Sequence, residues 1–350
     1  MPNEKAITIK QIAKKTGYSK ATVSRVLRNQ PGHSEKTKRK IQKAAEELGF
    51  TLHPIMSAVM SSVRFKKSST FSPVIAEVHC QPWNNQRGWN MDVLKNKIHE
   101  QAKTLGYSVE EFNWFEPGMS PARLLQILRA RGIKGVILEH FMQGDMELEV
   151  DLSDFAVVAI GGALRKPKLH RVEVNQYSSV LKAVQILRKR GYRRFGLAIP
   201  ALFEKLSDFK REAALHIANR EAPAEDHVPI YFMDEQRSFD GFKEWMDTHT
   251  PDCVLGVGRS VTRELESLGY RYPEDVGFAH LGWHSSYKGL AGINPHWGEI
   301  GIAAVNLVAD QLNRNETGIP QHPLWVLIEG EWVEGESVRP AVVVSESASV

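Results

Sequence analysis

The chain has 350 residues, of which 42% are hydrophobic and 25% charged, so two or three soluble globular domains are expected. No stretch approaches the roughly 18 apolar residues of a membrane span, and the N-terminus has no apolar core of an export signal. Two cysteines, Cys80 and Cys253, are too few for a disulfide framework or a structural zinc site. We therefore expect a cytoplasmic protein.

Charge is distributed unevenly along the chain. Residues 1–70 carry 15 Lys and Arg against 4 Asp and Glu, whereas the remaining residues carry 30 against 37. A basic head on an acidic body is typical of a polyanion-binding module joined to a domain with another task. A basic face that only contacts solvent explains the charge equally well. The sequence pattern within the head must therefore distinguish these two interpretations.

The head predicts three short helices. Thr8 begins a capping box, Gly17 supplies a tight turn, and Ser19 is a good N-cap for a second helix from Lys20 to about Asn29. Ser34 caps a third helix. A helix, a glycine turn and a second helix form a helix-turn-helix, whose second helix enters the major groove of DNA.

The outward side chains of the second helix suit DNA. Arg25 has the fork that matches guanine O6 and N7, and Ala21 fits a thymine methyl group. Thr22 and Ser24 suit phosphates or base edges. The alternative is a three-helix bundle that docks on protein, but the charge lies on the reading face and favours DNA.

The head also resembles a known family. Residues 9–27, read as IKQIAKKTGYSKATVSRVL, are similar to the head of the lactose/galactose repressor (LacI/GalR) family of bacterial transcription regulators. The resemblance implies that Lys20 and Ala21 choose the operator, that Arg25 makes a shared base contact, and that a homodimer reads an inverted repeat. The expected DNA-contacting residues are Thr8, Lys20, Ala21, Thr22, Ser24, Arg25, Asn29 and Val59.

Residues 51–70 have the composition of a linker. Pro54 suits the first turn of a short helix, which alone is marginal in water. The resembled family has a hinge helix here that folds on DNA and inserts a Leu into the minor groove. Alignment from Gly49 places Val59 at that Leu, and apolar wedges are a known minor-groove device.

This segment departs from the family pattern. The family commonly has Pro-Asn where this chain has Leu52-His53, and an Arg where it has Ser57. Met56 and Met60 are alternative wedges, and a plain flexible linker is the remaining alternative.

The body, residues 71–340, alternates short apolar runs with amphipathic helices, and residues 341–350 form a C-terminal tail. This alternation predicts an α/β body with two doubly wound parallel sheets covered on both faces. Strands are expected at 74–78, from 107 onward, and at 135–138, 156–160, 195–199 and 253–256. Helices are expected at 91–105, 120–131 and 176–190.

The body resembles the same family, whose body is like a periplasmic sugar-binding protein with three crossovers between its lobes. The matching landmarks are residues 172–176, 191–196, 298–304 and 320–335. The resemblance implies that a small molecule bound between the lobes modulates operator affinity.

Three residues are expected at the effector site. Ligands of such bodies lie beyond the carboxyl ends of the strands, where Trp83 and Trp283 offer aromatic faces. Each Trp alone is more often a packing residue. Asn175 and Gly282 stand where the family has sugar-binding aspartates, so we expect a ligand, a carbohydrate, that either depends less on hydroxyl contacts or is held by Trp stacking and neutral amides.

Enzyme classes find little support. The sequence has no Gly-x-Gly-x-x-Gly loop, and the pair Gly161-Gly162 fits a turn. His79 and Cys80 are strand neighbours on opposite faces, and the 13 histidines show no zinc-like spacing. We expect no catalytic residue, cofactor or metal. The competing hypothesis is a sugar-binding protein without a DNA role, against which the head argues.

Overall fold

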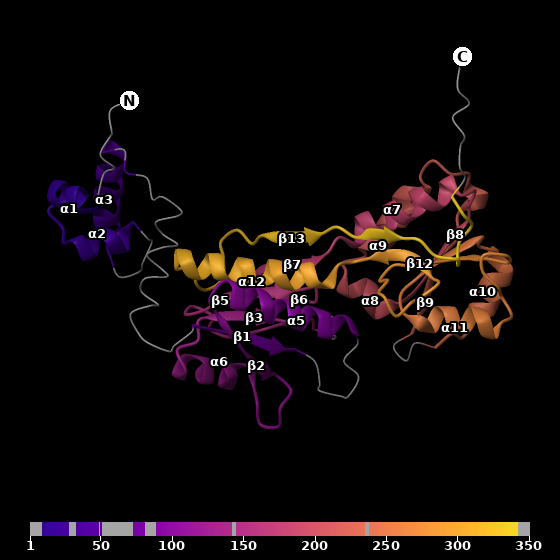
Figure 1. Ribbon diagram of the computed structural model, residues 1–350, viewed down its shortest axis with the longest axis horizontal. Helices are drawn as coiled ribbons and strands as arrows, with labels where there is room; N and C mark the ends of the chain where they lie inside the picture. Colours follow the sequence, from indigo (N-terminus) through magenta and orange to yellow (C-terminus); the bar gives the residue numbers. More distant parts are fainter. Residues whose placement is uncertain are drawn as a thin grey trace, which may run out of the picture.

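The computed structural model describes residues 9–27, 33–48, 50, 73–80, 89–141, 145–234 and 238–341 (Figure 1). Four predicted site residues, Thr8, Asn29, Val59 and Trp83, lie outside this set, as does nearly all of the predicted hinge. Among the described helices, none combines the length and apolar character needed to cross a membrane.

The head consists of helices α1 (Ile9–Thr16), α2 (Lys20–Val26) and α3 (Glu35–Glu47). The predicted Ser19 and Ser34 caps are confirmed, because their hydroxyls accept hydrogen bonds from backbone N–H groups at 3.1 and 3.3 Å. Helix α2 ends at Val26, earlier than the predicted Asn29. The helices enclose a small core of Ile12, Val23, Val26, Ile41, Ala44 and Ala45.

The first lobe of the body is built on a parallel sheet with the order β13-β7-β5-β3-β1-β2. Helices α5 (Trp89–Thr104) and α12 (Trp297–Arg314) cover one face, and α6 (Pro121–Ala130) covers the other (Figure 1). A small pair, β4 (Met146–Glu147) and β6 (Leu164–Lys166), lies beside it. The strands of the sheet are β1 (Val74–His79), β2 (Ser108–Asn113), β3 (Gly135–Leu138), β5 (Ala156–Ile160), β7 (His170–Val174) and β13 (Trp325–Ile328).

The second lobe repeats this plan with the order β14-β12-β11-β10-β8-β9. Helices α7 (Gln176–Lys189) and α9 (Lys210–Asn219) pack on one face, α10 (Phe242–His249) and α11 (Arg259–Ser267) on the other, and α8 (Ala201–Leu206) follows β8. Only β14 runs antiparallel to its neighbour among the strands of the described sheet. The strands are β8 (Phe195–Pro200), β9 (Tyr231–Met233), β10 (Cys253–Gly256), β11 (Gly277–His280), β12 (Ala291–Asn294) and β14 (Glu331–Val333).

The chain crosses between the lobes three times. It passes from β7 to α7, from β12 to α12 and from β13 to β14, because each pair has one member in each lobe. Both the two parallel-sheet lobes and the three crossovers predicted from the sequence are confirmed.

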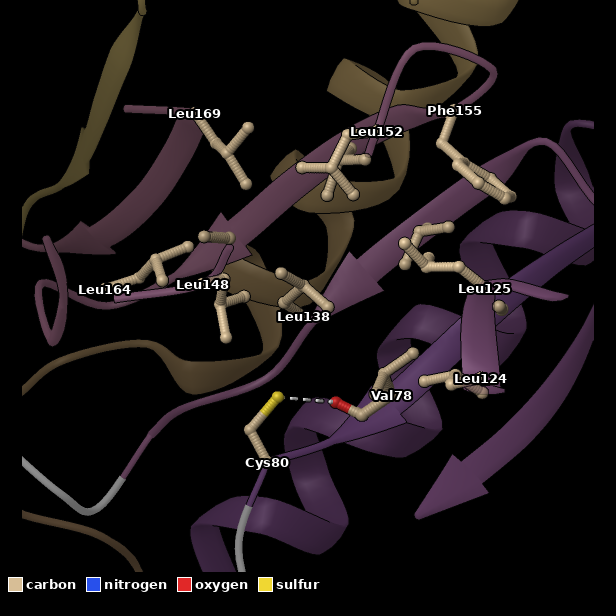
Figure 2. Close-up of a cluster of buried hydrophobic side chains, with 14 of the residues drawn as sticks. Val78, Cys80, Leu124, Leu125, Leu138, Leu148, Leu152, Phe155, Leu164 and Leu169 are labelled. Carbon is tan, nitrogen blue, oxygen red and sulfur yellow. Dashed lines mark hydrogen bonds between the residues drawn. The ribbon is translucent and has the colours of Figure 1, made fainter. Parts of the chain in front are cut away.

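Alternation along β1 separates apolar from polar side chains. Val78 and Cys80 face the α6 side, where the Cys80 thiol donates to the Val78 carbonyl at 3.4 Å within a cluster that includes Leu138 and Phe155 (Figure 2). Glu77 and His79 therefore face the α5 side of the sheet. This arrangement agrees with the prediction that His79 and Cys80 cannot serve each other.

Candidate functional site

Helix α2 presents the five predicted DNA contacts that the structure describes. Lys20, Ala21 and Arg25 are exposed, whereas Thr22 and Ser24 are half-buried. The Thr22 hydroxyl lies 2.9 Å from the Ser19 hydroxyl, so it shares in the N-cap as well as facing the surface. The inward residues Val23 and Val26 fix which face of α2 points outward.

The positive charge of the head is largely uncompensated. In the described head, acidic side chains neutralise two lysines, through Lys15–Glu47 and Lys38–Glu35 ion pairs of 2.7 Å. These contacts are exposed and contribute little to stability. The head therefore keeps a cationic surface around α2, as a phosphate-binding module requires.

Trp283 lies immediately beyond β11, at the carboxyl edge of the second sheet. It is half-buried, and its indole N–H donates to the Leu290 carbonyl at 2.8 Å. The polar atom of the side chain is thus satisfied within the lobe, which leaves the ring as an apolar surface. That state suits stacking against a ligand, and the effector role of Trp283 stays a prediction.

Four further side chains gather around the loop beyond β11 and were not predicted. The Tyr287 ring lies 3.9 Å from His284 and 4.2 Å from His280, and the Arg259 guanidinium lies 5.3 Å from it. Burial lowers the pKa of His280 to about 3, which keeps the ring neutral. An aromatic and cationic surface therefore lies at the carboxyl ends of β10 and β11.

Asn175 has its polar atoms occupied. Its side-chain oxygen caps α7 by accepting from Ser178 N at 3.1 Å, and its amide donates to Glu329 at 2.6 Å. The Ser178 hydroxyl donates to the same carboxylate at 2.6 Å. Asn175 thus connects the crossover from β7 to α7 with the crossover from β13 to β14. An effector that contacted the Asn175 side chain would replace one of these hydrogen bonds.

The lobes contact each other beside β6 and β7. Arg165 donates to Asp208 and, at 2.8 Å, to the Lys205 carbonyl, while Lys210 pairs with Glu173. Gly162 permits this approach, because a Cβ there would lie 2.5 Å from the Leu206 carbonyl oxygen. The pair Gly161-Gly162 is thus explained by a turn and a close lobe contact.

A group of carboxylates and imidazoles lies on the α5 face of the first sheet. His99 Nε2 lies 3.0 Å from Glu77 Oε2 and 3.8 Å from Glu111 Oε1. His79 lies 2.6 Å from Glu139 and 3.1 Å from Glu111. Burial first, and the neighbouring Glu139 second, raise the pKa of Glu77 to about 9. Sequence spacing could not reveal this group, because strand register and helix packing bring its members together.

Residues 8–52 match the family model described as bacterial regulatory proteins, lacI family. The head of the chain is therefore similar to the lacI family. The matched segment contains the whole described head, including the Ser19 cap and the exposed residues of α2. This match supports a DNA-binding role for the head.

Relatives extend the similarity from the head over the body of the chain. It is 26% identical over 285 residues to the NTD biosynthesis operon regulator NtdR of Bacillus subtilis (strain 168), covering 77% of this chain and 80% of that protein. The transcriptional regulator CelR–cellobiose complex shares 16% identity with a TM-score of 0.56, covering 95% of this chain and 99% of that one.

A second solved structure covers both head and body. The lac repressor dimer bound to operator and the anti-inducer ONPF shares 16% identity with a TM-score of 0.55, covering 96% of this chain and 100% of that one. At these identities the two solved structures show the fold of the chain and leave its ligands open.

Proposed function

We propose that this chain is a lacI-family transcription repressor that reads operator DNA with α2. The observation that carries the proposal is a Ser-capped helix whose exposed face holds Lys20, Ala21 and Arg25 in a cationic head. Arg25 reads guanine through its two-pronged guanidinium, while Lys20 and Ala21 select the neighbouring bases. Thr8, Thr22, Ser24 and Asn29 complete the contacts to phosphates and base edges.

The protein acts as a homodimer on an inverted repeat. One recognition helix covers a single half-site, and two-fold protein symmetry is mirrored in the operator. The similar lac repressor structure contains a dimer on its operator. We assign residues 1–50 to the DNA-binding head, 51–70 to a hinge with Val59 as minor-groove wedge, 71–340 to the body and 341–350 to a tail.

The body binds a small polar metabolite, a carbohydrate, between its lobes. The similar CelR structure is a cellobiose complex, and the loop that contains Trp283 also contains His284 and Tyr287, with Arg259 over the Tyr287 ring. Stacking on Trp283 and Trp83 and a neutral amide at Asn175 would replace aspartate contacts. The chain works by binding, without catalysis or a cofactor, and acts where the bacterial DNA is, in the cytoplasm.

Selection from a random DNA library tests the DNA role directly. The full-length protein should enrich an inverted repeat, and the affinity for this repeat should fall steeply with salt because Lys and Arg displace counterions from phosphates. If no sequence is enriched and carbohydrate binding persists, the chain is a sugar-binding protein without a DNA role. Enrichment of an asymmetric single site would overturn the dimeric arrangement instead.

A further inference from the structure

The first sheet carries an ionisable group of side chains on a face that is otherwise apolar. Ile75 on β1 and Ile137 on β3 belong to the core beneath α5 and α12. The residues two positions further along, Glu77 and Glu139, lie on the same face because strand side chains alternate. Val109 and Glu111 repeat this relation on β2, and Glu111 is in register with Glu77.

Three of these side chains already have the spacing of metal ligands. The ligand atoms of Glu77, His99 and Glu111 all lie within 4.8 Å of one another. A tetrahedral zinc site with bonds of about 2.0–2.2 Å separates its ligand atoms by about 3.3 Å. The measured 3.0 and 3.8 Å from His99 Nε2 to the two carboxylates lie on either side of that value.

Glu77 gives an independent sign of a ligand. Its side chain is fully buried, and within the described part of the chain its Oε1 atom has no hydrogen-bond partner. A buried polar atom without a hydrogen bond is costly, and a ligand that contacts it removes this cost. Glu77, Glu111 and Glu139 together offer three carboxyl groups, and Lys95 pairs with Glu111.

His79 and Glu139 are arranged to hold the ligand residues in position. His79 lies between Glu139 at 2.6 Å from Nδ1 and Glu111 at 3.1 Å from Nε2. Carboxylates and imidazoles that hold metal ligands in place fix their orientation and raise their affinity. Cys80 takes no part, because its thiol lies on the opposite face of the sheet.

We propose that Glu77, His99 and Glu111 bind one divalent transition-metal cation of the zinc class, oriented by His79 and Glu139. Imidazole and carboxylate ligands suit zinc and its neighbours better than magnesium or calcium, which prefer oxygen ligands alone. The cation enters beside α5, where the His99 and Glu111 side chains are 37% and 27% exposed. It links α5 to β1 and β2.

Lys95 competes with the cation. Its ammonium lies 2.8 Å from Glu111 Oε1, one of the atoms that the metal would take. Lys95 must turn outward when the site fills, and at 30% exposure its side chain has access to solvent. Removing the lysine charge should therefore tighten metal binding.

Calorimetric titration of the full-length, chelator-treated protein tests the site. Wild type should bind one equivalent of Zn²⁺ more tightly than Mg²⁺ and unfold at a higher temperature with Zn²⁺ present. His99→Gln and Glu111→Gln should abolish this binding, and Glu139→Gln should weaken it about 10–100-fold. The matched control is His216→Gln, an exposed histidine beside Glu212 on α9, which should leave binding unchanged.

Lys95→Gln separates a metal site from a purely structural cluster. The proposal requires this variant to bind Zn²⁺ more tightly than wild type, whereas a cluster held by Lys95 would lose stability and gain no affinity. The proposal is overturned if wild type binds no Zn²⁺, if His99→Gln binds it as tightly as wild type, or if Lys95→Gln fails to tighten binding.

Discussion

The two lobes share one strand order but differ on equivalent faces. The face of β1 that carries Ile75, Glu77 and His79 corresponds in β8 to Phe195, Leu197 and Ile199, all within the apolar core. After β3 stands Glu139, and after β10 stands Val257, which packs on that core. The fold itself thus does not require a charged group there, so the group in the first lobe points to a function.

Placing a carboxylate on the apolar face of β8 should have the largest effect on stability. Leu197→Glu places a carboxylate in the second lobe without the histidines and lysine that surround Glu77. An uncompensated buried charge should lower the free energy of unfolding by about 3–5 kcal/mol, measured by urea denaturation. An equally stable variant would mean that both faces accept charge and that the first lobe's group has no special compensation.

The carboxyl edges of the two sheets differ in a related way. Trp283 follows β11, whereas the position after β5 that matches it in strand register is Gly162. Trp283→Ala should weaken effector binding about tenfold or more, which corresponds to about 1.4 kcal/mol. Titration of a carbohydrate panel measures this. Phe232→Ala, an exposed aromatic on the edge strand β9, is the control and should bind normally. Equal affinity in Trp283→Ala would remove this residue from the site.

Sequence patterns predicted the fold far better than the ionisable group. The helices of the head could be predicted from Ser19, Ser34 and Gly17, because helix caps and tight turns depend on nearby residues. Short strands such as β9, with three residues, carry too little periodicity to be predicted. Glu77 looks like an ordinary solvent-facing residue in sequence. Its burial becomes evident only when strand register and α5 surround it.

The two caps of the head allow a matched comparison with smaller effects. Ser19→Ala and Ser34→Ala should each destabilise the head by about 1 kcal/mol, because each hydroxyl satisfies one backbone N–H. Thermal unfolding measures both. Operator affinity should fall more for Ser19→Ala, since Ser19 starts the reading helix. Equal losses of affinity would assign both caps to stability alone.

A pH effect in the second lobe should be smaller still. Burial holds the pKa of His280 at about 3, below the ordinary value of 6.5, so falling pH protonates the unfolded chain first. Its contribution to stability is complete above about pH 6.5 and is lost as the pH falls toward 3. His280→Gln should flatten the decline of unfolding free energy over this window, while exposed His216→Gln should not. An unchanged slope would contradict the burial argument.

Base discrimination by Arg25 tests the central claim most directly. Binding of wild type and Arg25→Ala should be compared on the selected operator and on operators with each half-site base exchanged in turn. We predict that Arg25→Ala costs about 1–3 kcal/mol on the selected operator and loses discrimination at one position per half-site. If Arg25→Ala weakened binding to every operator equally, Arg25 would contact phosphate alone, and the account of α2 as the reading helix would be contradicted.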